Sequence, residues 1–223
     1  MKTLFTAGAA IAIAMSAPAM SAELINDGSF ESGGLSNWHY TNVGGGTAPV
    51  VIAYGQAGGY PTGAFGEAIP ADAAAGSYAL YFSSDTANPD SISQMVNVVA
   101  GQTYTLSFDY YVPQNGYNNP YDASLSFLID GVQAGTTLTT GSAGSNTPAT
   151  TWEHFATSYT AMTTGTVNLD FQFRGLGNTA ADFAVDKVSM QAVPEPATWA
   201  MMILGLGVVG SSMRRRKADL SFA

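Results

Sequence analysis

Few side chains of the types that usually carry out catalysis are present. The chain has two histidines, His39 and His154, and no cysteine. It contains no Gly-x-Ser-x-Gly, no His-Glu-x-x-His and no phosphate-binding loop, which are spacings that enzymes commonly use. Fourteen Asp and Glu lie between residues 23 and 192, but carboxylate pairs suited to glycoside hydrolysis arise by chance among so many acids. The sequence therefore predicts a protein that is not an enzyme, with each histidine on a strand face or in a loop.

One polar loop has the side chains that sugar binding requires. Residues 113–122 contain three Asn and two Tyr. Aromatic rings offer flat apolar platforms with a polar edge, and amides donate and accept hydrogen bonds. We therefore predict a glycan-binding site at Tyr117, Asn118, Asn119 and Tyr121. Other aromatic residues could serve as platforms or fill a core, namely Trp38, Tyr40, Tyr54, Tyr60, Tyr111 and Trp152.

A change of alternation marks another candidate position. The apolar residues Phe183 and Val185 have odd numbers, whereas the next apolar residues, Val188 and Met190, have even numbers. One face of a strand is lined by every second residue, so the inward face changes parity around Asp186 and Lys187. A β-bulge there would direct the carboxylate of Asp186 towards a site.

The elements that must position these residues are β-strands. Alternation of apolar and polar residues is clearest over 103–110, 124–130 and 165–174 and predicts strands with one buried face. Weaker candidate strands cover 24–31, 38–43, 49–54, 78–83, 91–99, 152–161 and 182–190. About ten short strands, with no helical periodicity between residues 23 and 192, predict an all-β fold, an antiparallel jelly-roll β-sandwich.

Four short segments resemble a known domain family. They are Asn26-Asp27-Gly28-Ser29-Phe30-Glu31 followed by Trp38, Ala100 to Phe108, Thr151-Trp152-Glu153, and Phe183 to Val188. Together they resemble a carbohydrate-binding-module-like domain of the galactose-binding-like β-sandwich superfamily over Leu24 to Gln191. The resemblance implies a sandwich fold and extracellular polysaccharide as a partner.

The same resemblance implies a structural calcium ion. In such domains a Glu after the first Gly-x-Phe turn, here Glu31, and an Asp in the last strand, here Asp186, often approach one Ca²⁺. Calcium takes several hard oxygen ligands, so two carboxylates and nearby carbonyl groups would suit it. The alternative is an ordinary surface Glu31, with Asp186 paired to Lys187 or to a turn. We expect no other cofactor.

The first 22 residues predict a secretory signal peptide. Lys2 precedes an apolar run from Leu4 to Met15, and small residues follow up to Ala22, which is the pattern of an export signal. We predict cleavage after Ala22, with cleavage after Ala19 as the second choice. An uncleaved anchor is the alternative.

An uncharged apolar stretch near the other end predicts a transmembrane helix. Residues 197–213 would extend about 25 Å as a helix, which suits a thin bilayer. Arg214, Arg215, Arg216 and Lys217 follow directly and predict a stop that stays in the cytoplasm. A buried core helix is the alternative.

The residues around this stretch resemble the PEP-CTERM sorting signal of Gram-negative bacteria. The matching parts are Val193-Pro194-Glu195-Pro196, the Gly-rich apolar run and the basic residues that end at Lys217. The resemblance implies processing by a membrane transpeptidase-like enzyme, an exosortase, with Pro194, Glu195 and Pro196 as the sorting motif. We therefore expect a signal peptide over 1–22, a β-sandwich domain over 23–192 and a sorting signal over 193–217.

The charge of the predicted domain excludes some partners. Between residues 23 and 192 only Arg174 and Lys187 oppose the fourteen acids, which gives a net charge of −12. Nucleic acids and anionic lipids require positive charge, so we expect neither as a partner. Because an exported chain without cysteine has no disulfides, packing must supply its stability, with or without a metal.

These observations predict an exported protein. We expect an inner-membrane-anchored intermediate that faces the periplasm, and then a place on the cell surface or in the extracellular matrix of a Gram-negative bacterium. There we expect non-catalytic binding of extracellular polysaccharide, as in a biofilm matrix. The first alternative is a structural or adhesive surface protein without a small ligand, and the second is a polysaccharide hydrolase.

Overall fold

The alternating segments form strands in the computed structural model, which describes residues 21–42, 48–55, 68–72, 76–84, 87–113, 123–140, 150–175, 181–194 and 196–218. Ala22–Val193 is one compact unit. Its strands are β1 (His39–Asn42), β2 (Val50–Ala53), β3 (Tyr78–Ser84), β4 (Asp90–Val98), β5 (Thr103–Tyr111), β6 (Ala123–Ile129), β7 (Val132–Gln133), β8 (Leu138–Thr139), β9 (Trp152–Thr160), β10 (Gly165–Gly175) and β11 (Ala181–Ala192).

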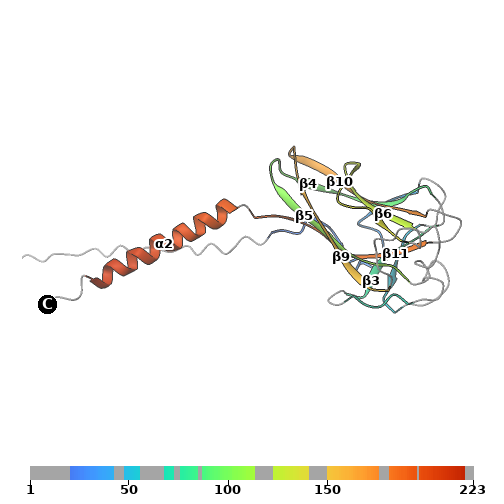
Figure 1. Cartoon of the computed structure of the whole chain (residues 1–223), viewed down its shortest axis with the longest axis horizontal. Coiled ribbons are helices and arrows are strands. Elements are labelled where there is room, and N and C mark those ends of the chain that lie inside the picture. Colours follow the sequence, from blue (N-terminus) through green and yellow to red (C-terminus); the bar gives the residue numbers. More distant parts are fainter. Residues whose placement is uncertain are drawn as a thin grey trace, which may run out of the picture. The chain divides into compact units, whose positions relative to one another are not determined.

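These strands make two antiparallel sheets, which Figure 1 shows as the two layers of a sandwich. One sheet has the order β1-β4-β10-β6-β7, with β8 also paired to β6, and the other has the order β2-β3-β11-β5-β9. The predicted all-β antiparallel sandwich is confirmed. The strands β7 and β8 were not predicted, because two residues are too few to show alternation.

Aromatic rings fill the space between the sheets. The ring centroids of Phe108 in β5 and Phe171 in β10 are 5.0 Å apart, and Phe171 lies 4.8 Å from Phe127 in β6. Phe108 also stacks on Phe155 of β9 at 4.7 Å. Trp38 belongs to the same core, so it is no sugar platform. Large side chains of this kind each contribute about 1.5–3 kcal/mol on burial, and together they hold the sheets face to face.

The prediction of a strand over residues 24–31 is wrong. Asp27 and Phe30 have φ values of 53° and 55°, which lie outside the strand region, and Phe30 N donates to Asp27 O at 3.2 Å. Before this turn Glu23 forms an isolated bridge with Gln191 of β11, and within the turn Gly28 O accepts a hydrogen bond from Val188 N of the same strand. The Asn-Asp-Gly sequence favours a turn, because Asn and Asp tolerate positive φ and bond to nearby backbone groups.

The predicted bulge in β11 is confirmed. The pairing of β11 with β5 shifts between Asp186 and Ser189, and Lys187 has a φ of 50°. Val185 and Val188 are both buried in the core between the sheets. The extra residue therefore lets the inner face stay apolar while Asp186 and Lys187 both reach the outer face.

The C-terminal segment from Pro194 belongs to a separate unit. It forms the helix α2 (Pro196–Ala218), which includes residues 197–217 of the predicted sorting signal. In the part of the chain that the structure describes, no helix is both long and apolar enough to span a membrane. The glycines and serines between residues 205 and 212 reduce its apolar character, and the predicted transmembrane passage has no support here. The predicted signal peptide lies almost wholly outside the described residues.

Replacing Gly28 is expected to destabilise the sandwich. A Cβ at this position would lie 1.9 Å from the carbonyl oxygen of Val188, whose amide donates to Gly28 O at 2.9 Å, so the first turn and the bulge would have to separate. We expect Gly28→Ala to reduce the free energy of unfolding by about 3 kcal/mol, measured by urea denaturation. Gly34→Ala is the control, because a Cβ there meets nothing within 4 Å. Equal stability of the two variants would contradict the close approach.

Candidate functional site

One outer face of the sandwich is partly covered by a loop segment. On the five-stranded sheet, Tyr81 of β3, Ala184 of β11 and Tyr111 of β5 form a second small apolar cluster with Ile69. Ile69 is fully buried, although it belongs to no strand. The segment 68–72 therefore lies over this face and brings Asp72 onto it.

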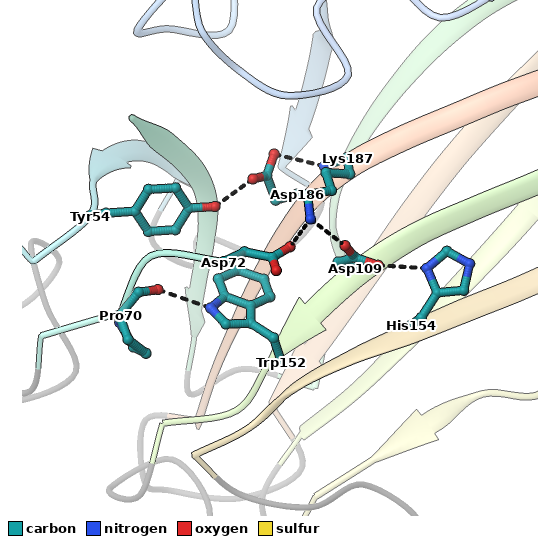
Figure 2. Close-up of polar contacts among 8 residues, drawn as sticks. All are labelled: Tyr54, Pro70, Asp72, Asp109, Trp152, His154, Asp186 and Lys187. Carbon is teal, nitrogen blue, oxygen red and sulfur yellow. Dashed lines mark hydrogen bonds and ion pairs between the residues drawn. The ribbon is translucent and has the colours of Figure 1, made fainter. Parts of the chain in front are cut away.

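Six polar side chains converge beside this apolar cluster, as Figure 2 shows. We call them the lysine–carboxylate cluster: Tyr54, Asp72, Asp109, His154, Asp186 and Lys187. Pairing between strands explains part of this convergence, because Asp109 of β5 lies opposite both His154 of β9 and Asp186 of β11. Residues directly opposite each other point to the same face of a sheet.

Asp186 is the most buried member of the cluster. Its side chain has no exposed surface, and it accepts hydrogen bonds from the Tyr54 hydroxyl and, at 2.6 Å, from the Lys187 amide. Burial raises the pKa of Asp186 to about 6, against the opposing effect of the Tyr54 hydrogen bond. Burial and the neighbouring Asp186 also raise the pKa of the Tyr54 hydroxyl, so that hydroxyl keeps its proton and remains a donor.

Lys187 connects two further carboxylates. Its Nζ lies 2.6 Å from Asp72 Oδ2 and 3.1 Å from Asp109 Oδ2, and Asp109 Oδ1 lies 2.6 Å from His154 Nδ1. Burial would lower the pKa of Lys187, but the two carboxylates outweigh it and raise that pKa. The Lys187 amine is therefore a protonated ammonium ion at neutral pH.

The two carboxylates differ in their affinity for a proton. Burial and then the neighbouring Asp109 raise the pKa of Asp72, although Lys187 opposes them. Burial acts in the same direction on Asp109, but hydrogen bonds from His154, Asp72 and Lys187 outweigh it and lower the pKa of Asp109. A proton shared by the two acids is therefore held more tightly by Asp72 than by Asp109.

Trp152 fixes the segment that carries Asp72. Its indole Nε1 donates to the carbonyl oxygen of Pro70 at 2.9 Å, as Figure 2 shows. Its ring meets the rings of Tyr54 and Tyr111 at centroid distances of 6.0 and 5.4 Å. These three aromatic residues, all considered as sugar platforms, thus support the covered face.

The predicted glycan-binding residues Tyr117, Asn118, Asn119 and Tyr121 lie outside the described residues, as does Glu195 of the sorting motif. The described strands on either side show what the loop joins. It leaves β5 in one sheet and enters β6 in the other.

The two predicted calcium ligands have different partners. Glu31 Oε1 accepts hydrogen bonds from the amides of Ser77 and Tyr78 at 2.7 and 3.0 Å, whereas Asp186 is held by Tyr54 and Lys187. Among the residues with a described position, no group of three or more Asp, Glu, His or Cys could hold a metal ion. Calcium binding by Glu31 and Asp186 therefore stays a prediction.

Four members of the cluster were not predicted, namely Tyr54, Asp72, Asp109 and His154. The alternation of strand 103–110 placed Asp109 on its polar face, and a strand over 152–161 contained His154. Strand register, which brings these two together, depends on contacts that are distant in sequence. Asp72 comes from a loop segment, where no periodic signal exists.

The outer face of the six-stranded sheet is polar and uncovered by the described loops. The pairings of β10 with β4 and β6 place hydroxyl, amide and carboxylate side chains in facing rows. We call these residues the polar face, and all are half-buried or exposed: Ser91, Ser93, Asn97, Ser126, Thr166, Asn168, Asp170 and Gln172. The exposed side chain of Met95 lies opposite Asn168 and adds an apolar surface.

Hydrogen bonds organise the polar face. Gln172 Nε2 donates to Asp170 Oδ2 at 2.9 Å, and Thr166 Oγ1 donates to Asn97 Oδ1 at 3.1 Å. Burial raises the pKa of Asp170, against hydrogen bonds from Gln172 and Ser91. The face therefore presents oriented donors and acceptors to the solvent.

Two family models match the sequence. The PEP-CTERM protein-sorting motif matches residues 192–217, and the carbohydrate binding domain CBM_4_9 matches residues 22–179. Both predicted resemblances are thereby confirmed. No curated protein matches the sequence.

Solved structures share the fold. TmCBM61, solved in complex with β-1,4-galactotriose, has a TM-score of 0.52 and 17% identity, over 78% of this chain and 100% of that chain. The Stig cyclase Fisc from Fischerella sp. TAU, in complex with (3Z)-3-(1-methyl-2-pyrrolidinylidene)-3H-indole, has a TM-score of 0.52 and 13% identity, over 78% and 99%. Similarity at this identity concerns the fold alone, and the fold is common to a sugar-bound module and an enzyme.

The raised pKa of Asp186 makes a testable prediction about pH. The pKa is about 6 in the folded protein against an ordinary 3.8, so the folded state binds this proton more tightly than the unfolded chain. Its contribution to stability is present below about pH 4 and is lost as the pH rises through 6. Tyr54→Phe removes a hydrogen bond to the carboxylate and should move the loss to higher pH.

A carboxyl-carbon NMR titration, assigned with Asp186→Asn, measures this pKa directly. Tyr159→Phe, near the other end of β9, is the control and should leave the midpoint unchanged. A wild-type midpoint at or below the ordinary value would contradict the burial argument.

Proposed function

The chain belongs to the carbohydrate binding domain family CBM_4_9, and on that premise we propose that it is an exported surface protein that binds extracellular polysaccharide without catalysing a reaction on it. The PEP-CTERM motif at residues 192–217 supports the surface destination. The observation that carries the proposal is the polar face of the six-stranded sheet, within the matched family region.

The polar face suits a sugar chain by its chemistry. Amide and hydroxyl side chains, such as Asn168, Gln172 and Ser126, can each donate and accept hydrogen bonds with sugar hydroxyls. The exposed Met95 offers an apolar patch for the C–H side of a sugar ring. The fixed pair of Gln172 and Asp170, 2.9 Å apart, reduces the side-chain entropy that binding would otherwise lose.

The loop that enters β6 supplies the aromatic part of the proposed site. Tyr117 and Tyr121 precede β6, whose Ser126 belongs to the polar face. We assign them as stacking platforms, with Asn118 and Asn119 as hydrogen-bonding partners. The site then combines a rigid polar sheet with an aromatic loop, as ligand sites commonly do.

Charge favours a neutral polysaccharide as the ligand. The region 23–192 carries a net charge of −12, and repulsion between like charges opposes the approach of an acidic polymer.

The non-catalytic part of the proposal rests on how the acidic side chains are used. The carboxylates of the lysine–carboxylate cluster are bonded to Tyr54, Lys187 and His154, on the opposite side of the sandwich from the polar face. A hydrolase would need two carboxylates on either side of a bound sugar.

The C-terminal motif supports a proposal about delivery. We infer that an exosortase-type enzyme recognises Pro194, Glu195 and Pro196, and that the protein reaches the surface or matrix of a Gram-negative bacterium. The family match to residues 192–217 supports this partner.

Binding should be measured by affinity electrophoresis of the purified protein against neutral and acidic polysaccharides. We expect retardation by a neutral polymer and none by acidic ones. Gln172→Ala should weaken binding about fivefold, the equivalent of one hydrogen bond of about 1 kcal/mol, and Tyr121→Ala should weaken it more, because stacking area is lost. Ser158→Ala, at an exposed position of β9, is the control.

Three outcomes distinguish the alternatives. Absence of binding to every polysaccharide contradicts the proposal and favours a structural or adhesive role. Release of reducing sugar from a bound polymer favours a hydrolase. Equal loss of binding in the Ser158→Ala control would show that the polar face is not the site.

The sorting motif should act independently of sugar binding. Replacing Pro194, Glu195 and Pro196 together with Ala should abolish C-terminal processing in a bacterium that has an exosortase, while polysaccharide binding stays unchanged. Mass spectrometry of the C-terminus and cell fractionation measure the two effects. Ser211→Ala, within α2, is the control and should be processed normally. Normal processing of the triple variant would contradict the proposed recognition.

A further inference from the structure

Lys187 is the only lysine between residues 23 and 192, and its amine is held between two carboxyl groups. Its Nζ lies 2.6 Å from Asp72 Oδ2 and 3.1 Å from Asp109 Oδ2. These side chains come from three separate parts of the chain, the segment before β3, strand β5 and strand β11 (Figure 2). An ordinary surface ion pair of a flexible lysine has no such fixed third group.

We propose that Lys187 and Asp72 form an intramolecular isopeptide bond, with Asp109 as the catalytic base. The bond would link the side-chain amine of β11 to the side-chain carboxyl group of the segment 68–72. It would be a covalent modification made by the protein on itself, on the face opposite the proposed sugar site.

The backbone holds both reacting groups in place. The bulge gives Lys187 a φ of 50°, which an L-residue adopts at a cost, and the Lys187 amide is bonded to Asp186 Oδ1 at 2.6 Å. On the other side, the buried Ile69 and the bond from Trp152 to Pro70 O fix the segment that carries Asp72. Reacting groups held at contact distance can gain an effective concentration of about 10⁵ M or more.

The reaction site is poor in water. The side chains of Asp72 and Asp109 are only 9% and 13% exposed, and that of Lys187 is 27% exposed. Burial raises the pKa of Asp72 and so favours its acid form. It also hinders hydrolysis of the amide once it has formed.

Each proton in the reaction has a place to go. The Lys187 ammonium group gives one proton to the Asp109 carboxylate, and the nitrogen lone pair then attacks Cγ of Asp72, which is in its acid form. The Cγ–Nζ bond forms, one C–O bond of Asp72 breaks, and the leaving hydroxyl takes a further proton from the nitrogen to depart as water. Asp109 then releases its proton to the solvent. No oxidant or other reagent is consumed.

The raised pKa of Asp72 suits its role as the electrophile, and Asp109 begins the reaction as a carboxylate. Burial and Asp109 raise the pKa of Asp72, which favours the acid form that can lose hydroxide as water. Hydrogen bonds, above all from His154, outweigh burial and lower the pKa of Asp109, so it is a carboxylate when the reaction starts.

The link would supply a covalent constraint that this chain otherwise lacks. An exported protein commonly uses disulfides for this purpose, but the chain has no cysteine. A bond from residue 72 to residue 187 would close a long loop and keep the segment 68–72 over the five-stranded sheet, reducing the entropy of the unfolded chain.

Mass spectrometry of the purified full chain, with its N-terminus determined, tests the proposal. The wild-type mass should be lower than the calculated mass by one water molecule, and a digest should contain one linked peptide joining Asp72 to Lys187. Lys187→Arg keeps the positive charge and both ion pairs but has no nucleophilic amine, so it should have the calculated mass. Circular dichroism checks that each variant is folded.

Two further variants separate the proposed roles. Asp72→Asn should still react and lose one ammonia molecule, because an amide can replace the acid as the electrophile. Asp109→Asn should stay unlinked, because the base is removed while the size is kept. A folded wild-type protein with the full calculated mass overturns the proposal. Loss of water without a linked peptide also overturns it, since a dehydration within Asp72 alone would explain that mass.

Discussion

The register shift in β11 is the constraint on which the covered face depends. This strand lies in the middle of the five-stranded sheet, and its inner face must stay apolar to pack against the other sheet. The bulge satisfies that need, because Val185 and Val188 are both buried while the two residues between them reach outward. The tight approach of Gly28 to Val188, joined by a hydrogen bond of 2.9 Å, fixes the bulge against the first turn. Two consecutive polar residues can thus point to the same face.

The two outer faces of the sandwich are consequently different. On one, Ile69 and Trp152 hold a loop segment against the sheet, and a buried acid, Asp186, must be stabilised by a hydroxyl and an amide. On the other, the rows around Gln172 and Asp170 are half exposed, with hydrogen bonds that orient them. Burial favours structural chemistry on the first face, and exposure favours recognition of a ligand on the second. One face of such a sandwich can therefore be held rigid while the other stays open to a ligand.

Strand positions were largely readable from the sequence, because alternation is a local consequence of one buried face. The strands around Phe108, Phe127 and Phe171 occur where the alternation is clearest. The error over residues 24–31 has a local cause as well, since the turn at Asp27 uses side-chain and backbone bonds that an apolar pattern ignores. The parity change beside Asp186 was also local, and it correctly placed the bulge.

The sequence by itself determined the strands, the bulge, the strong negative charge of the domain and the sorting motif, because each depends on neighbouring residues or on composition. Only the tertiary structure decided that Lys187 lies between Asp72 and Asp109, or that Asp109 meets His154. These contacts join segments that are far apart in the chain, and they depend on strand register and on where a loop packs. Long-range packing has no periodic signature in sequence, so the chemistry of this cluster becomes visible only when the sheets are assembled.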